Sequence, residues 1–245
     1  VSIAGNAICS ALSFRLGPGE CWGVLGANGT GKTTLLHTLA GLRPAQGGEL
    51  LLDHQPLRRL GRRTIARRMG LMPQDNHDPF PTSVLETALI GRHPWLGAWQ
   101  WEGESDRAIA ETALADVGLA RLAERPVTTL SGGERRRLAL ATLLTQAPDI
   151  ALLDEPSNHL DLHHQIQLLA RVTGKAHEHG RTAVMSLHDV NLAARFCDHV
   201  LLLFGNGQAC FGQTATVLNE TTLSRLYGHP IRIIDDGRHR AYLPA

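Results

Sequence analysis

Residues 26–34 read GANGTGKTT, a glycine-rich stretch in which a lysine is followed by two threonines. Glycine allows the backbone to turn closely, so that its amide groups can point toward phosphate oxygens. Lys32 would neutralise charge on the β- and γ-phosphates of a nucleotide, and the Thr33 hydroxyl is a suitable Mg²⁺ ligand. The pattern G-x-x-x-x-G-K-[ST] therefore predicts a nucleoside triphosphate site.

The whole loop is expected to line that site, and its residues are Gly26, Ala27, Asn28, Gly29, Thr30, Gly31, Lys32, Thr33 and Thr34. The choice of lysine is informative. Among 24 basic residues, the only lysines are Lys32 and Lys175. In a chain that otherwise uses arginine, this choice indicates a need for an ammonium group at position 32.

A second candidate is an acidic pair that follows an apolar run, IALLDE at 150–155. Ligands of open α/β sheets collect at the carboxyl ends of the strands. Asp154 is suited to the Mg²⁺ shell, directly or through water. Glu155, which points elsewhere, is suited to orient and polarise an attacking water. Together with the phosphate loop, this pair predicts hydrolysis of the nucleotide.

A third candidate is the stretch LSGGERRRL at 130–138. Ser131, Gly132 and Gly133 stand at the expected start of a helix, where free backbone amides and the helix dipole favour an anion. The chain thus has two predicted phosphate-binding segments, about a hundred residues apart.

The elements that must position these residues follow from apolar patterning. Continuous apolar runs are typical of strands buried on both faces of a mostly parallel sheet, and they occur at 150–153, 183–187 and 200–204. Strands are also expected at 21–25 and 69–74. Residues 11–16 are expected to form a further N-terminal strand, and residues 47–53 a turn followed by a strand. Helical spacing predicts helices at about 32–40, 62–68 and 162–173. The fold class is α/β, of the P-loop NTPase type.

Between residues 75 and 147 the pattern is helical throughout, with loops and no convincing strand. We interpret this segment as an inserted helical subdomain. The chain is then a single domain, 1–245, in which 1–74 and 148–245 form the nucleotide-binding core and 75–147 the insertion.

Composition excludes several other classes of protein. A formal net charge of +1 gives no reason to expect bulk binding to nucleic acid or anionic lipid. The four cysteines form no CxxC pair, which favours reduced thiols. No apolar run approaches the ~18 residues needed to span a bilayer, so any role at a membrane requires a partner.

Five motifs occur in a familiar order: Gln74 within MPQD, LSGGE at 130–134, LLDEP at 152–156, SNHLD at 157–161 and SLHD at 186–189. In this order they resemble the motifs of ATP-binding cassette (ABC) ATPases, and the resemblance covers essentially the whole chain. It implies an ABC-type ATPase core with N-terminal antiparallel strands, which binds ATP and Mg²⁺ and hydrolyses ATP as the ATPase subunit of a membrane ABC transporter.

The resemblance also implies a homodimer in which two cassettes meet head to tail. Ser131, Gly132 and Gly133 of one copy would contact the γ-phosphate held by Lys32 of the other. The two phosphate-binding segments would then belong to opposite sides of one shared site, and ATP would hold the two copies together until hydrolysis releases them.

Three further roles are carried over from the family. Gln74 would link Mg²⁺ to the helical subdomain, as a metal ligand and a member of the catalytic set. His188 would contact the γ-phosphate, and Asp161 would tune the facing site. One departure concerns adenine, which the family usually stacks on an aromatic residue near positions 3–5. The stretch SIAGN contains none.

The stretch DPFPTSVLETALIGRHPW at 78–95, with SNHLD, is similar to importers of iron–siderophore complexes, haem and vitamin B12. This implies membrane permease subunits, and indirectly a substrate-binding protein, as partners. It also implies a peripheral position on the cytoplasmic face of the inner membrane. Trp95, Trp99 and Trp101 would serve either in core packing or as a docking surface for the permease.

The alternatives are another cargo, or an ABC ATPase that works with nucleic acid instead of a transporter. Chromosome-associated members need a long heptad insertion, and translation-associated members carry two cassettes. A P-loop GTPase would need an NKxD-type guanine-binding motif. We find none of these features in the sequence, and therefore expect no nucleic-acid partner.

Overall fold

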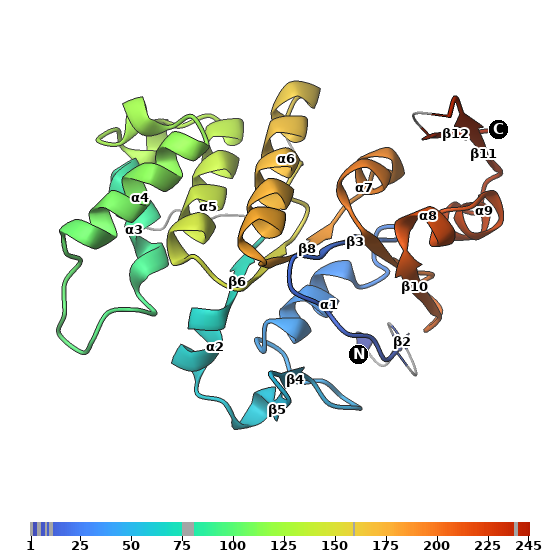
Figure 1. Ribbon diagram of the computed structural model, residues 1–245, viewed down its shortest axis with the longest axis horizontal. Helices are drawn as coiled ribbons and strands as arrows, with labels where there is room; N and C mark the ends of the chain where they lie inside the picture. The colour runs from blue at the N-terminus through green and yellow to red at the C-terminus, as the bar shows by residue number, and fades with distance from the viewer. Residues whose placement is uncertain are drawn as a thin grey trace.

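The computed structural model describes residues 2–3, 6–7, 9, 12–74, 81–158, 160–237 and 240–245. Its centre is a six-stranded sheet in the order β10-β9-β3-β8-β7-β6 (Figure 1). The strands are β3 (Cys21–Leu25), β6 (Met69–Met72), β7 (Ile150–Leu153), β8 (Thr182–Ser186), β9 (His199–Leu203) and β10 (Ala209–Gln213). All neighbouring pairs are parallel except β9–β10. The predicted mostly parallel sheet is therefore confirmed.

Helices cover both faces of this sheet because its strands are apolar on both sides. In β3, Cys21 and Leu25 pack in one cluster with Leu169 of α6 (Leu162–His179). Trp22 packs in a second cluster with Leu36 of α1 (Lys32–Leu39). Side chains of a strand alternate between faces, so α6 and α1 lie on opposite sides of β3.

A third cluster lies in the helical segment between β6 and β7. There α3 (Val84–Leu89), α4 (Glu104–Asp116) and α5 (Gly132–Gln146) enclose a core of their own, to which Val84, Leu114 and Leu138 belong. Figure 1 shows these helices gathered at one end of the molecule. An inserted helical layer is therefore present. Its predicted start, residue 75, lies outside the described residues, so the boundaries 75–147 stay a prediction.

The remaining elements surround this framework. The other helices are α2 (Arg62–Arg68), α7 (Val190–Phe196), α8 (Thr214–Val217) and α9 (Glu220–Tyr227), with short 3₁₀ turns at Leu57–Arg59, Ile90–Arg92, Ala120–Leu122 and Val127–Thr129. Three antiparallel pairs complete the fold: β1 (Ser2–Ile3) with β2 (Asn6–Ala7), β4 (Leu51–Leu52) with β5 (Gln55–Pro56), and β11 (Ile231–Asp235) with β12 (Arg240–Pro244). Within the described ranges, no helix has both the length and the apolar character to cross a bilayer.

Two predicted elements need correction. Residues 12–16 are not a strand: Leu12, Phe14 and Leu16 pack on the cluster that contains Trp22, but they are assigned to no ladder. Alternating side chains can thus pack without strand pairing. The second correction concerns α6, which continues past residue 173 to His179, because Gly174 is tolerated inside the helix and Gly180, at φ 63°, caps it.

Candidate nucleotide-binding and catalytic site

The phosphate loop connects β3 to α1 at the carboxyl end of the sheet. Gly31 caps α1 in the left-handed conformation, at φ 99°, and Gly29 has φ 79°. Gly26 is required for a different reason, because a Cβ there would lie 2.7 Å from the carbonyl oxygen of Leu203. Ala27, Asn28 and Gly29 are exposed. The loop is closely wound and open to solvent on its outer side, as a phosphate site requires.

Lys32 is buried, with 5% of its surface exposed. Its Nζ donates to the carbonyl oxygens of Gly26, at 2.9 Å, and Ala27, at 3.3 Å. Burial lowers the pKa of this ammonium, while the negative charges of Glu155 and Asp154 act to raise it. The structure therefore places Lys32 close to the acidic pair, with its positive charge inside the loop.

Asp154 follows β7 and is fully buried. Ser186 of β8 donates to its Oδ1 at 2.6 Å and accepts the Glu155 amide at 2.8 Å. The other carboxylate oxygen, Oδ2, is buried and has no hydrogen-bond partner among the described residues. An uncompensated buried anion is costly, and a cation would satisfy it. Oxygen ligands of this kind fit Mg²⁺. The second predicted ligand is the hydroxyl of Thr33, which is half-buried.

Glu155 is where the predicted catalytic residues meet. Its side chain is 9% exposed, and its Oε1 lies 2.6 Å from His188 Nε2. Gln74 Nε2 donates to Oε2 at 2.8 Å, and Asn158 donates to the same oxygen. The residue has φ 48°, an unusual backbone conformation for glutamate. Gln74, Glu155 and His188 thus form one cluster beside the phosphate loop.

Arg136, on α5, holds the loops that carry this cluster. It is 5% exposed and donates to backbone carbonyl oxygens of two segments, residues 73–74 and residues 154–156. Its acceptors are the carbonyls of Pro73 (2.7 Å), Gln74 (2.8 Å), Glu155 (2.6 Å), Pro156 (3.2 Å) and Asp154. A buried guanidinium therefore links the helical layer to residues 73–74 and to residues 154–156, which follow β7.

Two groups of predicted site residues lie apart from the cluster. Ser131 caps α5, where its Oγ accepts the Glu134 amide at 3.3 Å and its own amide donates to the Glu134 carboxylate at 2.7 Å. Gly132 is exposed, and a Cβ there would meet nothing within 4 Å. Asp161 caps α6 by accepting the His164 amide at 2.9 Å. Among the described residues, the hydrogen bonds of these two caps stay within their own helix starts, and Ser131 and Asp161 are exposed.

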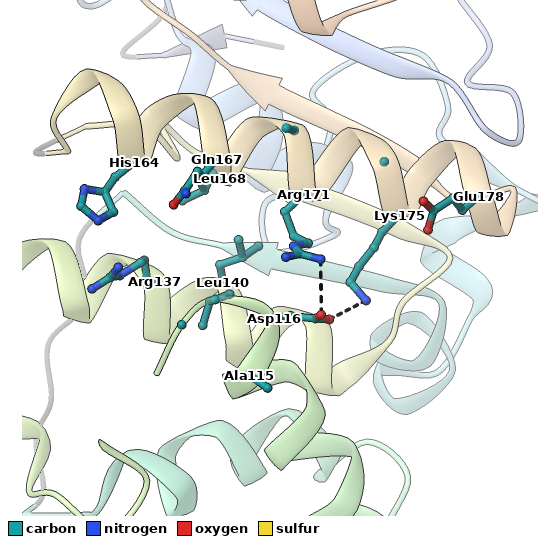
Figure 2. Close-up of a pocket in the computed structure, with 14 residues that line it drawn as sticks. Ala115, Asp116, Arg137, Leu140, His164, Gln167, Leu168, Arg171, Lys175 and Glu178 are labelled. Carbon is teal, nitrogen blue, oxygen red and sulfur yellow. Dashed lines mark hydrogen bonds and ion pairs between the residues drawn. The ribbon is translucent and has the colours of Figure 1, made fainter. Parts of the chain in front are cut away.

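A cavity of about 550 Å³ separates the helical layer from α6. Figure 2 shows Asp116 at the end of α4 facing two cations of α6, Arg171 at 3.5 Å and Lys175 at 2.6 Å. Arg137 of α5 lines the same cavity, and its buried Nε has no hydrogen-bond partner in the described part of the chain. Ion pairs thus join the helical layer to the core across an open space.

Comparison with known proteins agrees with this geometry. The family model described as ABC transporter matches residues 9–158, which include the phosphate loop, the α5 cap and the acidic pair. This chain belongs to the ABC transporter family. It is 38% identical over 229 residues to the hemin import ATP-binding protein of Nocardia farcinica, covering 93% of this chain and 78% of that protein. The cassette hydrolyses ATP, as members of the family do.

Two solved structures are informative about the ABC cassette. One is described as an inward-facing metal-chelate type ABC transporter, with a TM-score of 0.81, 30% identity, and coverage of 96% of this chain and 89% of that one. The other is a dimeric post-hydrolysis cassette bound to ADP and phosphate, with a TM-score of 0.74, 26% identity, and coverage of 84% and 90%.

Sequence reasoning missed three polar residues of the cassette. Ser186 is a polar residue inside an apolar strand, which is a recognisable signal. Arg136 shares a helical face with the buried Leu140 and Leu143, and this spacing could have distinguished it from its surface neighbours. Asn158, within the SNHLD stretch, donates to the Glu155 carboxylate. The contact depends on how the chain turns after β7.

Substituting Arg136 by glutamine is expected to lower the kcat for ATP about tenfold to a hundredfold, with KM nearly unchanged, because small displacements of catalytic loops have large effects on rate. Steady-state kinetics check this, with lysine as the conservative variant expected to recover part of the rate. Arg137→Gln, on the adjacent position of α5, is the matched control. A loss of thermal stability and nucleotide affinity in proportion to the rate would indicate a purely structural role instead.

Proposed function

We propose that this cassette is the ATP-hydrolysing subunit of a membrane importer, in which ATP-driven association of two copies drives uptake. The observation that supports this most strongly is the convergence of Gln74 and His188 on Glu155, next to Lys32 and Asp154. The cluster brings a carboxylate, an imidazole and an ammonium group to one edge of the sheet, which is the set that phosphoanhydride hydrolysis needs.

In this proposal each residue of the chain has a defined task. The amides of the loop 26–34 and Lys32 hold the phosphates, and Asp154 with Thr33 and Gln74 would hold Mg²⁺, which neutralises charge on the phosphate oxygens when bound. Glu155 orients the attacking water and accepts its proton. His188 would contact the γ-phosphate, and its 2.6 Å contact with Glu155 supports this role.

The second half of the site would come from another copy of the chain. Ser131 and Gly132 are exposed and Gly133 is half-buried at a helix start that suits an anion, and the Ser131 side chain caps α5. A head-to-tail dimer would bring this start to the γ-phosphate held by the partner, and Asp161 would lie beside the same interface. The dimeric cassette among the similar structures supports this assembly.

Permease subunits would bind at the helical layer. Trp95 is fixed there by its Nε1 hydrogen bond to the carbonyl of Gln146, so packing explains it in part. Trp99 is fully exposed and Trp101 is 85% exposed, and packing explains neither. We therefore assign these two residues to docking of a permease, which would hold the cassette on the cytoplasmic face of the inner membrane. A substrate-binding protein would be an indirect partner that acts through the permease.

The proposed cargo is an iron chelate, haem or a corrinoid. The sequence stretch 78–95 carries this proposal, supported by the hemin import relative and the metal-chelate type structure. Uptake of a radiolabelled ferric siderophore, haem and cobalamin should be compared in cells with and without the gene. We expect loss of uptake for one class, restored by the wild-type chain and not by Lys32→Ala. Unchanged uptake of all three compounds would contradict the proposed class of cargo.

A further inference from the structure

A cluster of potential metal ligands lies at the N-terminal ends of the parallel strands, opposite the ends that carry the phosphate loop. Cys21 is the first residue of β3, His177 is in the last turn of α6, and Asp198 immediately precedes β9. One ligand atom from each lies within 4.8 Å of the other two. We propose that these residues bind a borderline divalent cation such as Zn²⁺, independently of the nucleotide site.

The chemistry of the three groups matches that cation. Thiolate sulfur, imidazole nitrogen and carboxylate oxygen are the ligands that zinc takes in proteins. Ligand atoms around a tetrahedral zinc ion lie about 3.3–3.8 Å apart. His177 Nε2 and Asp198 Oδ2 are already 3.1 Å apart, close to the separation that two ligands of one tetrahedral ion require.

The backbone that carries these ligands is fixed before any ion binds. The Cys21 amide donates to Asp198 Oδ2 at 2.8 Å, and the Asp198 amide donates back to the Cys21 carbonyl at 2.8 Å. A carboxylate offers about four acceptor positions, so Asp198 can keep this hydrogen bond while it binds a cation. The amide contact would then orient the ligand, as second contacts of metal ligands commonly do.

Burial divides the site into a closed and an open side. Cys21 is fully buried, whereas the side chains of His177 and Asp198 are 50% and 45% exposed. An ion would enter from the His177 side, and water would complete its fourth position. Burial, with the Asp198 charge, raises the pKa of the Cys21 thiol to about 12. Binding of the cation must therefore displace the thiol proton to solvent.

The test is Zn²⁺ titration of the whole chain without nucleotide, after removal of metal by a chelator. We expect one ion per chain, and His177→Ala should weaken its affinity at least about tenfold. The matched control is His179→Ala, an exposed histidine two residues further along the same helix end. Equal affinities of these two variants, or no saturable binding to the wild-type chain, would overturn the proposal.

Co²⁺ provides a second measurement that identifies the thiol directly. A bound thiolate gives Co²⁺ a sulfur-to-metal charge-transfer band, which we expect in the wild-type chain and in Cys210→Ala but not in Cys21→Ala. A Co²⁺ complex without this band overturns the assignment of Cys21. Should Cys21→Ala fail to fold, the comparison of His177→Ala with His179→Ala decides the proposal alone.

Discussion

Replacing Glu155 by glutamine is expected to lower ATP turnover about 10²–10⁴-fold, the usual contribution of a general base, while ATP binding persists. Glutamine keeps the shape of the side chain but cannot accept the proton of the attacking water. Its neighbours Gln74 and Asn158 would still be able to contact its amide oxygen. The phosphate loop and Asp154 are unchanged, so the nucleotide should be retained.

Hydrolysis and equilibrium nucleotide binding should be measured on the same preparation. Glu111→Gln is the matched control, because Glu111 is an exposed glutamate of α4 whose carboxylate pairs with Arg107. Near-normal hydrolysis by the Glu155 variant would remove this residue from the role of base. His188, which already contacts Glu155, would then be the next candidate.

Mixing two inactive variants, Lys32→Ala and Ser131→Arg, is expected to restore ATPase activity. In a heterodimer of these chains one site carries both lesions, and the other joins an intact Lys32 to an intact Ser131. Activity should reach at most about half of the wild-type rate per heterodimer if the two sites act independently in a symmetric pair. The physical reason is that Ser131 caps α5 and is exposed, so that the phosphate loop of another copy could meet it.

The control mixture combines Lys32→Ala with a chain that carries both substitutions. Every site in that mixture lacks Lys32, so no activity should return. Subunit exchange is verified by co-purification of differently tagged chains, with the permease present if isolated cassettes dimerise poorly. Full activity of Ser131→Arg alone would show that this serine makes no essential phosphate contact. Verified heterodimers without activity would mean that the sites must act together or do not pair across subunits, and a cross-link from Ser131 to the partner's phosphate loop would distinguish these cases.

Elements with strong local signals could be predicted from the sequence. The strand Ile150–Leu153 and the helix Arg62–Arg68 have the predicted bounds. Two weaker predictions were wrong because the same sequence pattern is compatible with two different structures. Leu12 and Phe14 alternate as a strand would but pack without a ladder, and Gly174 resembles a helix stop although α6 continues through it.

The site shows the same division. Lys32, Asp154 and Glu155 are identified by local motifs, because the chemistry requires those residue types at those spacings. Gln74 and His188 needed the family resemblance, since the sheet brings them to Glu155 across 81 and 33 residues. Arg136 could not be identified as the link between loops, because its acceptors are backbone carbonyls, which no sequence pattern displays. Ala4, where the family places its adenine-stacking aromatic, lies outside the described residues.

The scarcity of lysine has a practical consequence for labelling chemistry. The chain has two ε-amines, and they occupy contrasting places: Lys32 is enclosed by the phosphate loop, and Lys175 pairs with Asp116 across the cavity beside α6. Acylating reagents attack the neutral amine, so burial both favours the reactive form of Lys32 and restricts access to it. Acylation of the two side chains can therefore be resolved as two separate signals in one peptide map. One signal reports occupancy of the phosphate loop, and the other reports whether the helical layer remains joined to the core.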